Sequence, residues 1–271
     1  MTEKRPSEVI MSSEDPGELV VAAIALARSI NPEDQPLLGS MLKTPGFLGR
    51  LDSETDYAQP PNFLRIASVI DALKKNPAMS AQSLLIDLMI SPVFTESPSR
   101  VVLLIEASIA IRPAPPEVVA FWERHTGVES VYMNILMHAL MENCSEGAVE
   151  LFFKKIGDSQ YEEKKRIWWM RENIPPHCND PLVLENCLKM FKGITADKLK
   201  IGLVEVLFDF QRTWFRPSTP VSTVPLSAFK PNERLKLHSV GEYALQNLTL
   251  PDTLQQAVKD TLKKLNLDEG R

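Results

Sequence analysis

Apolar residues recur at helical spacing along most of this chain, and prolines interrupt them at short intervals. Phe63, Ile66 and Ile70 fall on one side of a helix, and a second apolar stripe follows after Pro77 and ends before Pro92. The residue before a proline avoids the helical region of backbone space, so each proline marks a helix boundary. The pattern predicts two consecutive antiparallel helices, which form a helical hairpin.

The same two-helix pattern recurs through the rest of the chain. The first helices of successive pairs are predicted to begin near Pro98, Val128, Gln160, Thr195 and Pro231, at intervals of about 30 to 36 residues. Helix pairs repeated at such a period stack on their neighbours to bury their apolar faces. The predicted fold is all-α, a right-handed α-solenoid of stacked antiparallel helix pairs.

This rhythm resembles the arrays of HEAT and armadillo repeats. Two segments support the resemblance, SRVVLLIEASIAIR (99–112) and ERLKLHSVGEYALQNL (233–248), in which Ala107 and Ala244 lie inside the apolar stripe. The resemblance covers residues 62–265 and implies an architecture that often binds other proteins. The period is closer to that of tetratricopeptide repeats, but their Trp, Gly-Tyr and Pro signature is absent. An irregular helical domain is the alternative.

Three regions are predicted from these boundaries. Residues 1–15 are charged and lack periodicity, which predicts a disordered tail. Residues 16–61 are predicted to hold N-terminal helices and a loop, and residues 62–267 the repeat array. A Pro-rich insertion at 214–231 interrupts the array.

The insertion also carries aromatic residues, among them Trp214 and Phe215. A free linker has little use for aromatic side chains, so we expect the insertion to pack against the array and to cover part of its binding surface. A structural insertion without a binding role is the other interpretation.

Composition narrows the classes of partner. The 271 residues carry a formal net charge of -5, whereas binders of nucleic acid usually present a basic patch to phosphate. Nucleic acid is therefore disfavoured. The three cysteines are too few and too widely spaced for a disulfide framework, and no apolar run has the length of a signal peptide or a membrane span. We expect a cytoplasmic protein without membrane contact.

Polar residues form narrow stripes on two helices that are otherwise apolar. Asn134, His138 and Glu142 are spaced by four residues, and so are Glu205 and Asp209. Such stripes are either solvated faces or parts of a binding groove. Two plausible metal ligands on the first helix are too few for a metal site.

If equivalent helices stack in register, these carboxylates and Glu106 form an acidic band. An acidic band favours a basic peptide or protein as the partner.

The adjacent residues Trp168 and Trp169 are the most unusual local feature. Neighbouring positions on a helix point about 100° apart, so one indole is expected in the core and the other partly exposed. Arg171 lies close to the exposed one, and a Trp beside an Arg is typical of binding hot spots. Alternatively, both indoles are buried at two interfaces of a sandwiched helix.

The Trp pair also resembles a feature of HEAT-like DNA glycosylases that remove alkylated purines. Those enzymes use Trp, an acidic residue and Arg around a lesion, but here Met170 follows the pair where an acidic residue is expected. The acidic net charge also opposes a duplex ligand.

No catalytic motif or cofactor site is recognisable. His177, Cys178 and Cys187 do not have zinc-ligand spacing, and adjacency in sequence does not supply the geometry of a Cys-His nucleophile. The sequence therefore predicts a non-enzymatic module that binds a protein or peptide, without cofactor or metal. The alternatives are an enzyme of the glycosylase type on a HEAT-like scaffold and a structural subunit that oligomerises.

Overall fold

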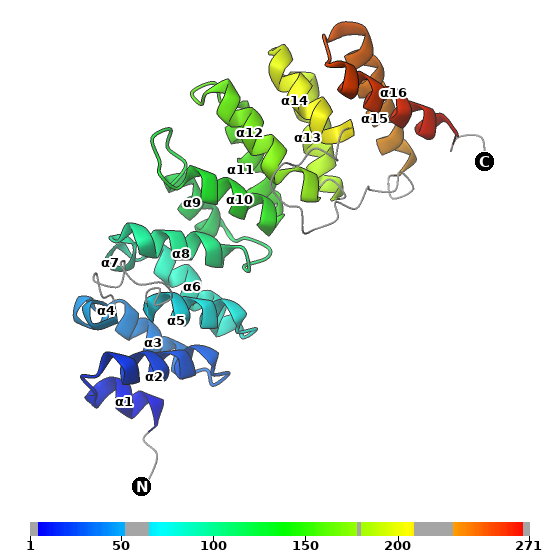
Figure 1. The fold of residues 1–271 in the computed structure, drawn as a ribbon. Coiled ribbons are helices and arrows are strands. Elements are labelled where there is room, and N and C mark those ends of the chain that lie inside the picture. Colours follow the sequence, from blue (N-terminus) through cyan, green and yellow to red (C-terminus); the bar gives the residue numbers. More distant parts are fainter. Residues whose placement is uncertain (1–4, 52–64, 178–179, 209–229, 268–271) are drawn as a thin grey trace. The chain divides into compact units, whose positions relative to one another are not determined.

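The computed structural model describes residues 5–51, 65–177, 180–208 and 230–267 (Figure 1). These residues form helices and connections, and no strand occurs among them, so the predicted all-α class is confirmed. Packing divides the chain into two compact units, Met1–Gly127 and Val128–Arg271.

The first unit is a succession of short helices separated mostly by prolines. Its helices are α1 (Pro6–Ser12), α2 (Pro16–Arg28), α3 (Asp34–Leu42), α4 (Pro45–Leu51), α5 (Arg65–Lys75), α6 (Met79–Ile90), α7 (Pro92–Thr95), α8 (Pro98–Ser108) and α9 (Pro116–Arg124).

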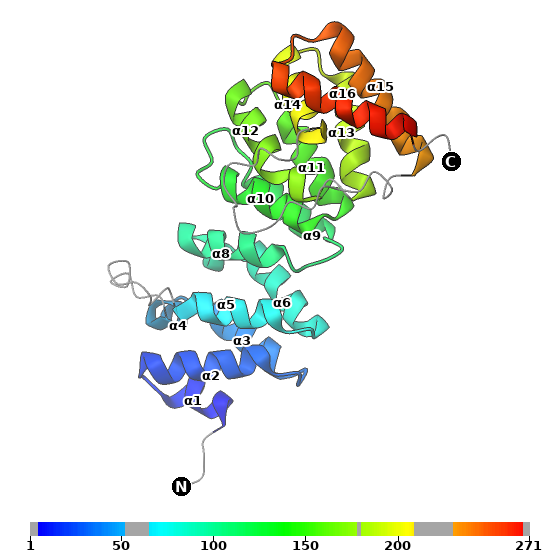
Figure 2. The ribbon, with the colours of Figure 1, turned by 45° about the vertical axis from the view of Figure 1, so that its right-hand side comes forward.

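These helices pack in two layers. In one layer α2, α5 and α8 lie side by side, and in the other α3, α6 and α9 do so. Figure 2 shows α5 between α2 and α8. The core between the layers includes Leu19, Leu38, Ile66 and Leu88, all fully buried. Each helix therefore hides its apolar stripe against both its partner and its neighbours.

Residues 5–15, which the sequence placed in a disordered tail, include a helix in the structure. Helix α1 packs on α2 and buries Ile10, which is 1% exposed. Asp15 begins α2, because its carboxylate accepts hydrogen bonds from the backbone N–H groups of Gly17 (2.7 Å) and Glu18 (2.9 Å). A helix of seven residues is too short to show a clear hydrophobic period in the sequence. Packing on α2, with burial of Ile10, accounts for the helix.

The predicted boundary at residue 61 also differs from the observed division at Gly127. The Asn76 side-chain amide donates hydrogen bonds to the carbonyl oxygens of Ala27 (2.7 Å) and Ser29 (2.9 Å), which ties the α5–α6 turn to the end of α2. The N-terminal helices thus belong to the same unit as the first predicted repeats. Part of the segment predicted as a loop forms α4, whose Phe47, Leu48 and Leu51 are buried.

The second unit repeats the two-layer arrangement. Its elements are α10 (Met133–Asn143), α11 (Glu146–Gly157), α12 (Glu163–Asn173), the 3₁₀ turn η2 (Pro175–His177), α13 (Pro181–Gly193), α14 (Asp197–Phe208), α15 (Pro231–Asn247) and α16 (Asp252–Leu267). Helices α10, α12, α14 and α16 form one layer, and α11, α13 and α15 form the other.

Helix α15 does not begin a new pair as the period predicted. It packs on α13 in the second layer and on α14, so it is the second helix of the pair that α14 begins. The interval from Thr195 to Pro231 matched a full period only because residues 209–229 separate α14 from its partner. Residues 214–229 of the predicted Pro-rich insertion lie outside the described residues, and Pro231, its last residue, begins α15.

Candidate functional site

The polar stripe of α10 meets α12 and the turn after it. The indole N–H of Trp169 donates a hydrogen bond to the side-chain oxygen of Asn134 at 3.0 Å. At the other end of α10, the carboxylate of Glu142 lies 3.4 Å from Nε2 of His177. His138 lies between them and is partly buried. Two members of the predicted stripe therefore bind neighbouring elements of their own unit.

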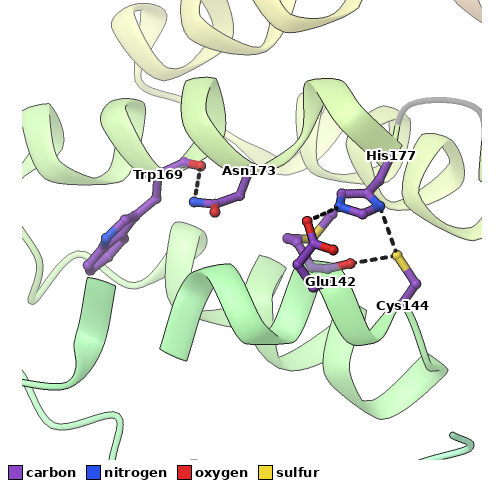
Figure 3. A network of polar contacts seen from close by, with 6 residues as sticks. Glu142, Cys144, Trp169, Asn173 and His177 are labelled. Carbon is purple, nitrogen blue, oxygen red and sulfur yellow. Dashed lines mark hydrogen bonds and ion pairs between the residues drawn. The ribbon is translucent and has the colours of Figure 1, made fainter. Parts of the chain in front are cut away.

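The two tryptophans divide as the helix geometry predicted. Trp169 is fully buried, with its ring 5.2 Å from that of Tyr161 in an edge-on arrangement, and Asn173 donates a hydrogen bond to its carbonyl oxygen at 2.9 Å (Figure 3). Trp168 is 43% exposed. The pair therefore offers one exposed ring.

Tyr161 packs against Trp169, and the pKa of its hydroxyl is shifted from the ordinary value of 10.0. Burial of its hydroxyl raises the pKa above 10.0, and the neighbouring Asp158 carboxylate raises it further. Both effects disfavour the phenolate. Tyr161 therefore stays neutral at physiological pH and serves as a packing partner of Trp169.

Ion pairs join α12 to α14 across their exposed edge. Arg171 donates hydrogen bonds to the Glu205 carboxylate through Nε at 2.7 Å and also through a terminal nitrogen. Lys198 lies 3.3 Å from the carboxylate of Glu163. These pairs compensate charges that the sequence suggested were available for a partner.

The predicted acidic band remains a prediction. Glu106 lies on α8 in the first unit, Glu142 and Glu205 each pair with a basic group, and Asp209 lies outside the described residues. The candidate residues Trp214 and Phe215 also lie outside them.

A hollow of about 380 Å³ opens between α13, α14 and α15. Its described lining combines apolar side chains with three lysines and two hydroxyl-bearing residues: Leu188, Phe191, Lys192, Lys200, Lys236, Ser239, Val240 and Tyr243. We call this hollow the lysine pocket. Its volume falls within the range of about 300 to 1,000 Å³ that is usual for ligand sites.

Two aromatic rings and one lysine order the lysine pocket. Phe191 and Tyr243 meet edge to face with ring centres 5.6 Å apart. The Lys200 ammonium lies 4.8 Å from the centre of the Tyr243 ring and donates a hydrogen bond to the Tyr243 hydroxyl at 3.1 Å. These contacts hold the Lys200 charge at the pocket instead of letting it move freely in solvent. Among the residues that the structure describes, no acidic side chain lines the lysine pocket.

Sequence reasoning did not find the lysine pocket. One signal was present, because Lys236, Val240 and Tyr243 have the spacing of one helix face. This spacing alone does not predict the pocket, because the lining comes from three helices, α13, α14 and α15. The predicted repeat period also placed α15 in the wrong layer.

Two further features of the described residues concern metal ions and membranes. Among the described residues, no group of three or more His, Cys, Asp or Glu side chains has an arrangement that could hold a metal ion. Across the same ranges, no helix combines the length and the apolar character that crossing a membrane requires.

Comparison with known proteins gives no relative. The chain matches no protein-family model, no curated protein and no solved structure.

Proposed function

We propose that this chain is a non-enzymatic protein-interaction module that binds an acidic peptide segment of a partner protein in the lysine pocket. The scaffold we propose is a right-handed α-solenoid of the HEAT or armadillo-like kind, in the cytoplasm. The two-layer packing within each unit supports that scaffold, because helix pairs that stack on their neighbours are its defining arrangement.

The observation that carries the proposal is the combination of an apolar floor and three ammonium groups in one hollow. Leu188, Phe191 and Val240 are buried and form an apolar surface that a leucine or phenylalanine side chain of a peptide can cover. Lys192 and Lys236 are exposed beside this surface. Carboxylates that flank such an anchor would pair with them.

The charges at the lysine pocket are available for a ligand. Within the described part of the chain, Lys192, Lys200 and Lys236 form no ion pair with a carboxylate. Lys198, two residues before Lys200 on α14, differs because it pairs with Glu163. Complementary charge steers association and rejects partners of the wrong sign. An acidic segment therefore fits this site better than the basic partner expected from the acidic band.

Selection from a random peptide library tests the proposal. Peptides of about 16 residues displayed on phage are selected against the intact, immobilised chain, and enriched sequences are synthesised for fluorescence anisotropy. We expect enriched peptides to combine Asp or Glu with Leu or Phe. Each of Lys200→Glu and Lys236→Glu should weaken their binding at least about tenfold, or roughly 1.4 kcal/mol, since reversal places like charges together.

Lys198→Glu is the matched control, because it reverses a lysine on the same helix outside the lysine pocket. It should leave affinity within about twofold. Enrichment of basic peptides, failure to enrich any family, or equal loss of affinity in the Lys198 and Lys200 variants would overturn the proposal.

A further inference from the structure

Three side chains with nucleophile, base and carboxylate chemistry meet at the end of α10. The sulfur of Cys144 lies 3.3 Å from Nδ1 of His177, and Nε2 of the same ring lies 3.4 Å from the Glu142 carboxylate (Figure 3). Glu142 lies on α10, Cys144 is the residue that ends this helix, and His177 lies in η2. We call these residues the thiol cluster.

The two neighbours of the His177 ring determine which of its nitrogens carries a proton. A carboxylate only accepts hydrogen bonds, so Glu142 favours the ring in which Nε2 carries a proton. In the neutral form of that ring, Nδ1 has a lone pair directed at the Cys144 sulfur. His177 can then take the thiol proton, and the resulting imidazolium lies between a thiolate and a carboxylate that both stabilise it.

The sulfur is held in place by an unusual backbone conformation. Cys144 ends α10 with a φ of 53°, in the left-handed region that glycine normally occupies at this position of a helix end. Its backbone N–H donates to the Leu140 carbonyl oxygen at 3.2 Å. A side chain kept in this conformation costs about 1 kcal/mol or more relative to glycine, and such positions concentrate at functional sites.

The thiol cluster is partly exposed to solvent. Cys144 is partly exposed, as are the side chains of His177 (18%) and Glu142 (34%). The other described cysteine, Cys187, is fully buried on α13. The sulfur of Cys144 also lies 2.6 Å from the Met141 carbonyl oxygen, which competes with His177 for the thiol proton. Exposure and a neighbouring base are the conditions under which cysteines react.

We propose that Cys144 is a peroxide-sensitive thiol, with His177 as its base and Glu142 as the residue that orients the base. The thiolate attacks one oxygen of a hydroperoxide, so that an S–O bond forms and the O–O bond breaks. The sulfur is oxidised by two electrons to a sulfenic acid and the peroxide is reduced. The proton on His177 passes to the leaving hydroxide or alkoxide, which leaves as water or alcohol.

A peroxide suits this site better than an acyl substrate. Acyl transfer needs a cleft beside the nucleophile and donors for the developing oxyanion. The lysine pocket does not include any residue of the thiol cluster. A small oxidant needs only access to the sulfur. The proposal is also independent of peptide binding at the lysine pocket.

Trapping of sulfenic acid in the intact chain tests the proposal. The protein is treated with hydrogen peroxide near neutral pH in the presence of dimedone, and mass spectrometry of its peptides follows labelling at Cys144, Cys178 and Cys187. An ordinary thiol is only a few per cent thiolate at pH 7, so we expect Cys144 to react about ten times faster than Cys187. His177→Ala should slow labelling of Cys144 about tenfold.

His238→Ala is the matched control. His238 on α15 also lies near a glutamate, with Nδ1 3.5 Å from the Glu242 carboxylate. Its removal should leave the rate unchanged, whereas Glu142→Ala should give an intermediate loss. Circular dichroism checks each fold, and His177→Gln replaces a variant that unfolds. Cys144 labelling no faster than that of Cys187, or a rate unaffected when His177 is replaced, would overturn the proposal.

Discussion

The buried indole of Trp169 and its neighbour Trp168 provide a matched pair of substitutions. Trp169 is fully buried and donates a hydrogen bond to Asn134, whereas Trp168 is 43% exposed. Trp169→Phe should destabilise the second unit by about 2 to 3 kcal/mol. Loss of buried aromatic volume accounts for about 1 to 2 kcal/mol and loss of the hydrogen bond for about 1 kcal/mol. Trp168→Phe should cost less than about 0.5 kcal/mol.

A double-mutant cycle isolates the hydrogen bond. Asn134→Ala should cost about 1 kcal/mol when Trp169 is present, because it leaves a buried N–H without its acceptor. In the Trp169→Phe background the same change should cost almost nothing, which gives a coupling free energy of about 1 kcal/mol. Urea unfolding followed by far-UV circular dichroism measures all four stabilities. Equal losses from the two Trp→Phe changes, or a coupling near zero, would refute the reasoning.

Three further substitutions follow from packing and burial. Ser108→Ala should lower the free energy of unfolding by about 1 to 2 kcal/mol, because the Ser108 hydroxyl accepts a hydrogen bond of 2.8 Å from the buried Trp122 N–H. An unchanged urea midpoint would contradict this. Gly241→Ala should destabilise the protein by about 1 kcal/mol, since the added Cβ would lie 2.9 Å from a side-chain carbon of α16. At Gly193 an added Cβ meets nothing within 4 Å, so Gly193→Ala should be neutral or slightly stabilising. Thermal melts compare the two variants. Burial raises the pKa of Tyr161 above its value in the unfolded chain, so the native state holds the phenolic proton more tightly. The resulting contribution to the free energy of unfolding is complete below pH 10 and is lost as the pH rises through the raised pKa. Tyr161→Phe should therefore reduce the loss of stability above pH 10 in urea titrations, and an unchanged loss would exclude Tyr161 as its source.

The candidate sites show the limit of inference along one helix. The i to i+4 stripes on α10 and the 100° separation of Trp168 and Trp169 follow from the helical period, so their relative burial was predictable. The pairing of Arg171 with Glu205 and of Glu142 with His177 joins residues 34 and 35 positions apart, respectively. Sequence spacing carries no information about which helices are neighbours in space.

The thiol cluster illustrates the same limit at a chemical site. Cys178 is adjacent to His177 in sequence, whereas Cys144 lies 33 positions before it. The structure places Cys144 against the His177 ring, because α10 packs beside α12 and η2 follows α12 near the end of α10.

The sequence by itself determined the helical class, most helix boundaries and the apolar face of each helix. These properties are local, since proline, N-cap residues and a period of 3.6 act within a few residues of the chain. Tertiary packing alone decided that α1 joins the first unit, that α15 is a partner of α14, and that three lysines surround one hollow. Such outcomes depend on which apolar faces cover one another, and many helices in this chain have apolar faces that could do so.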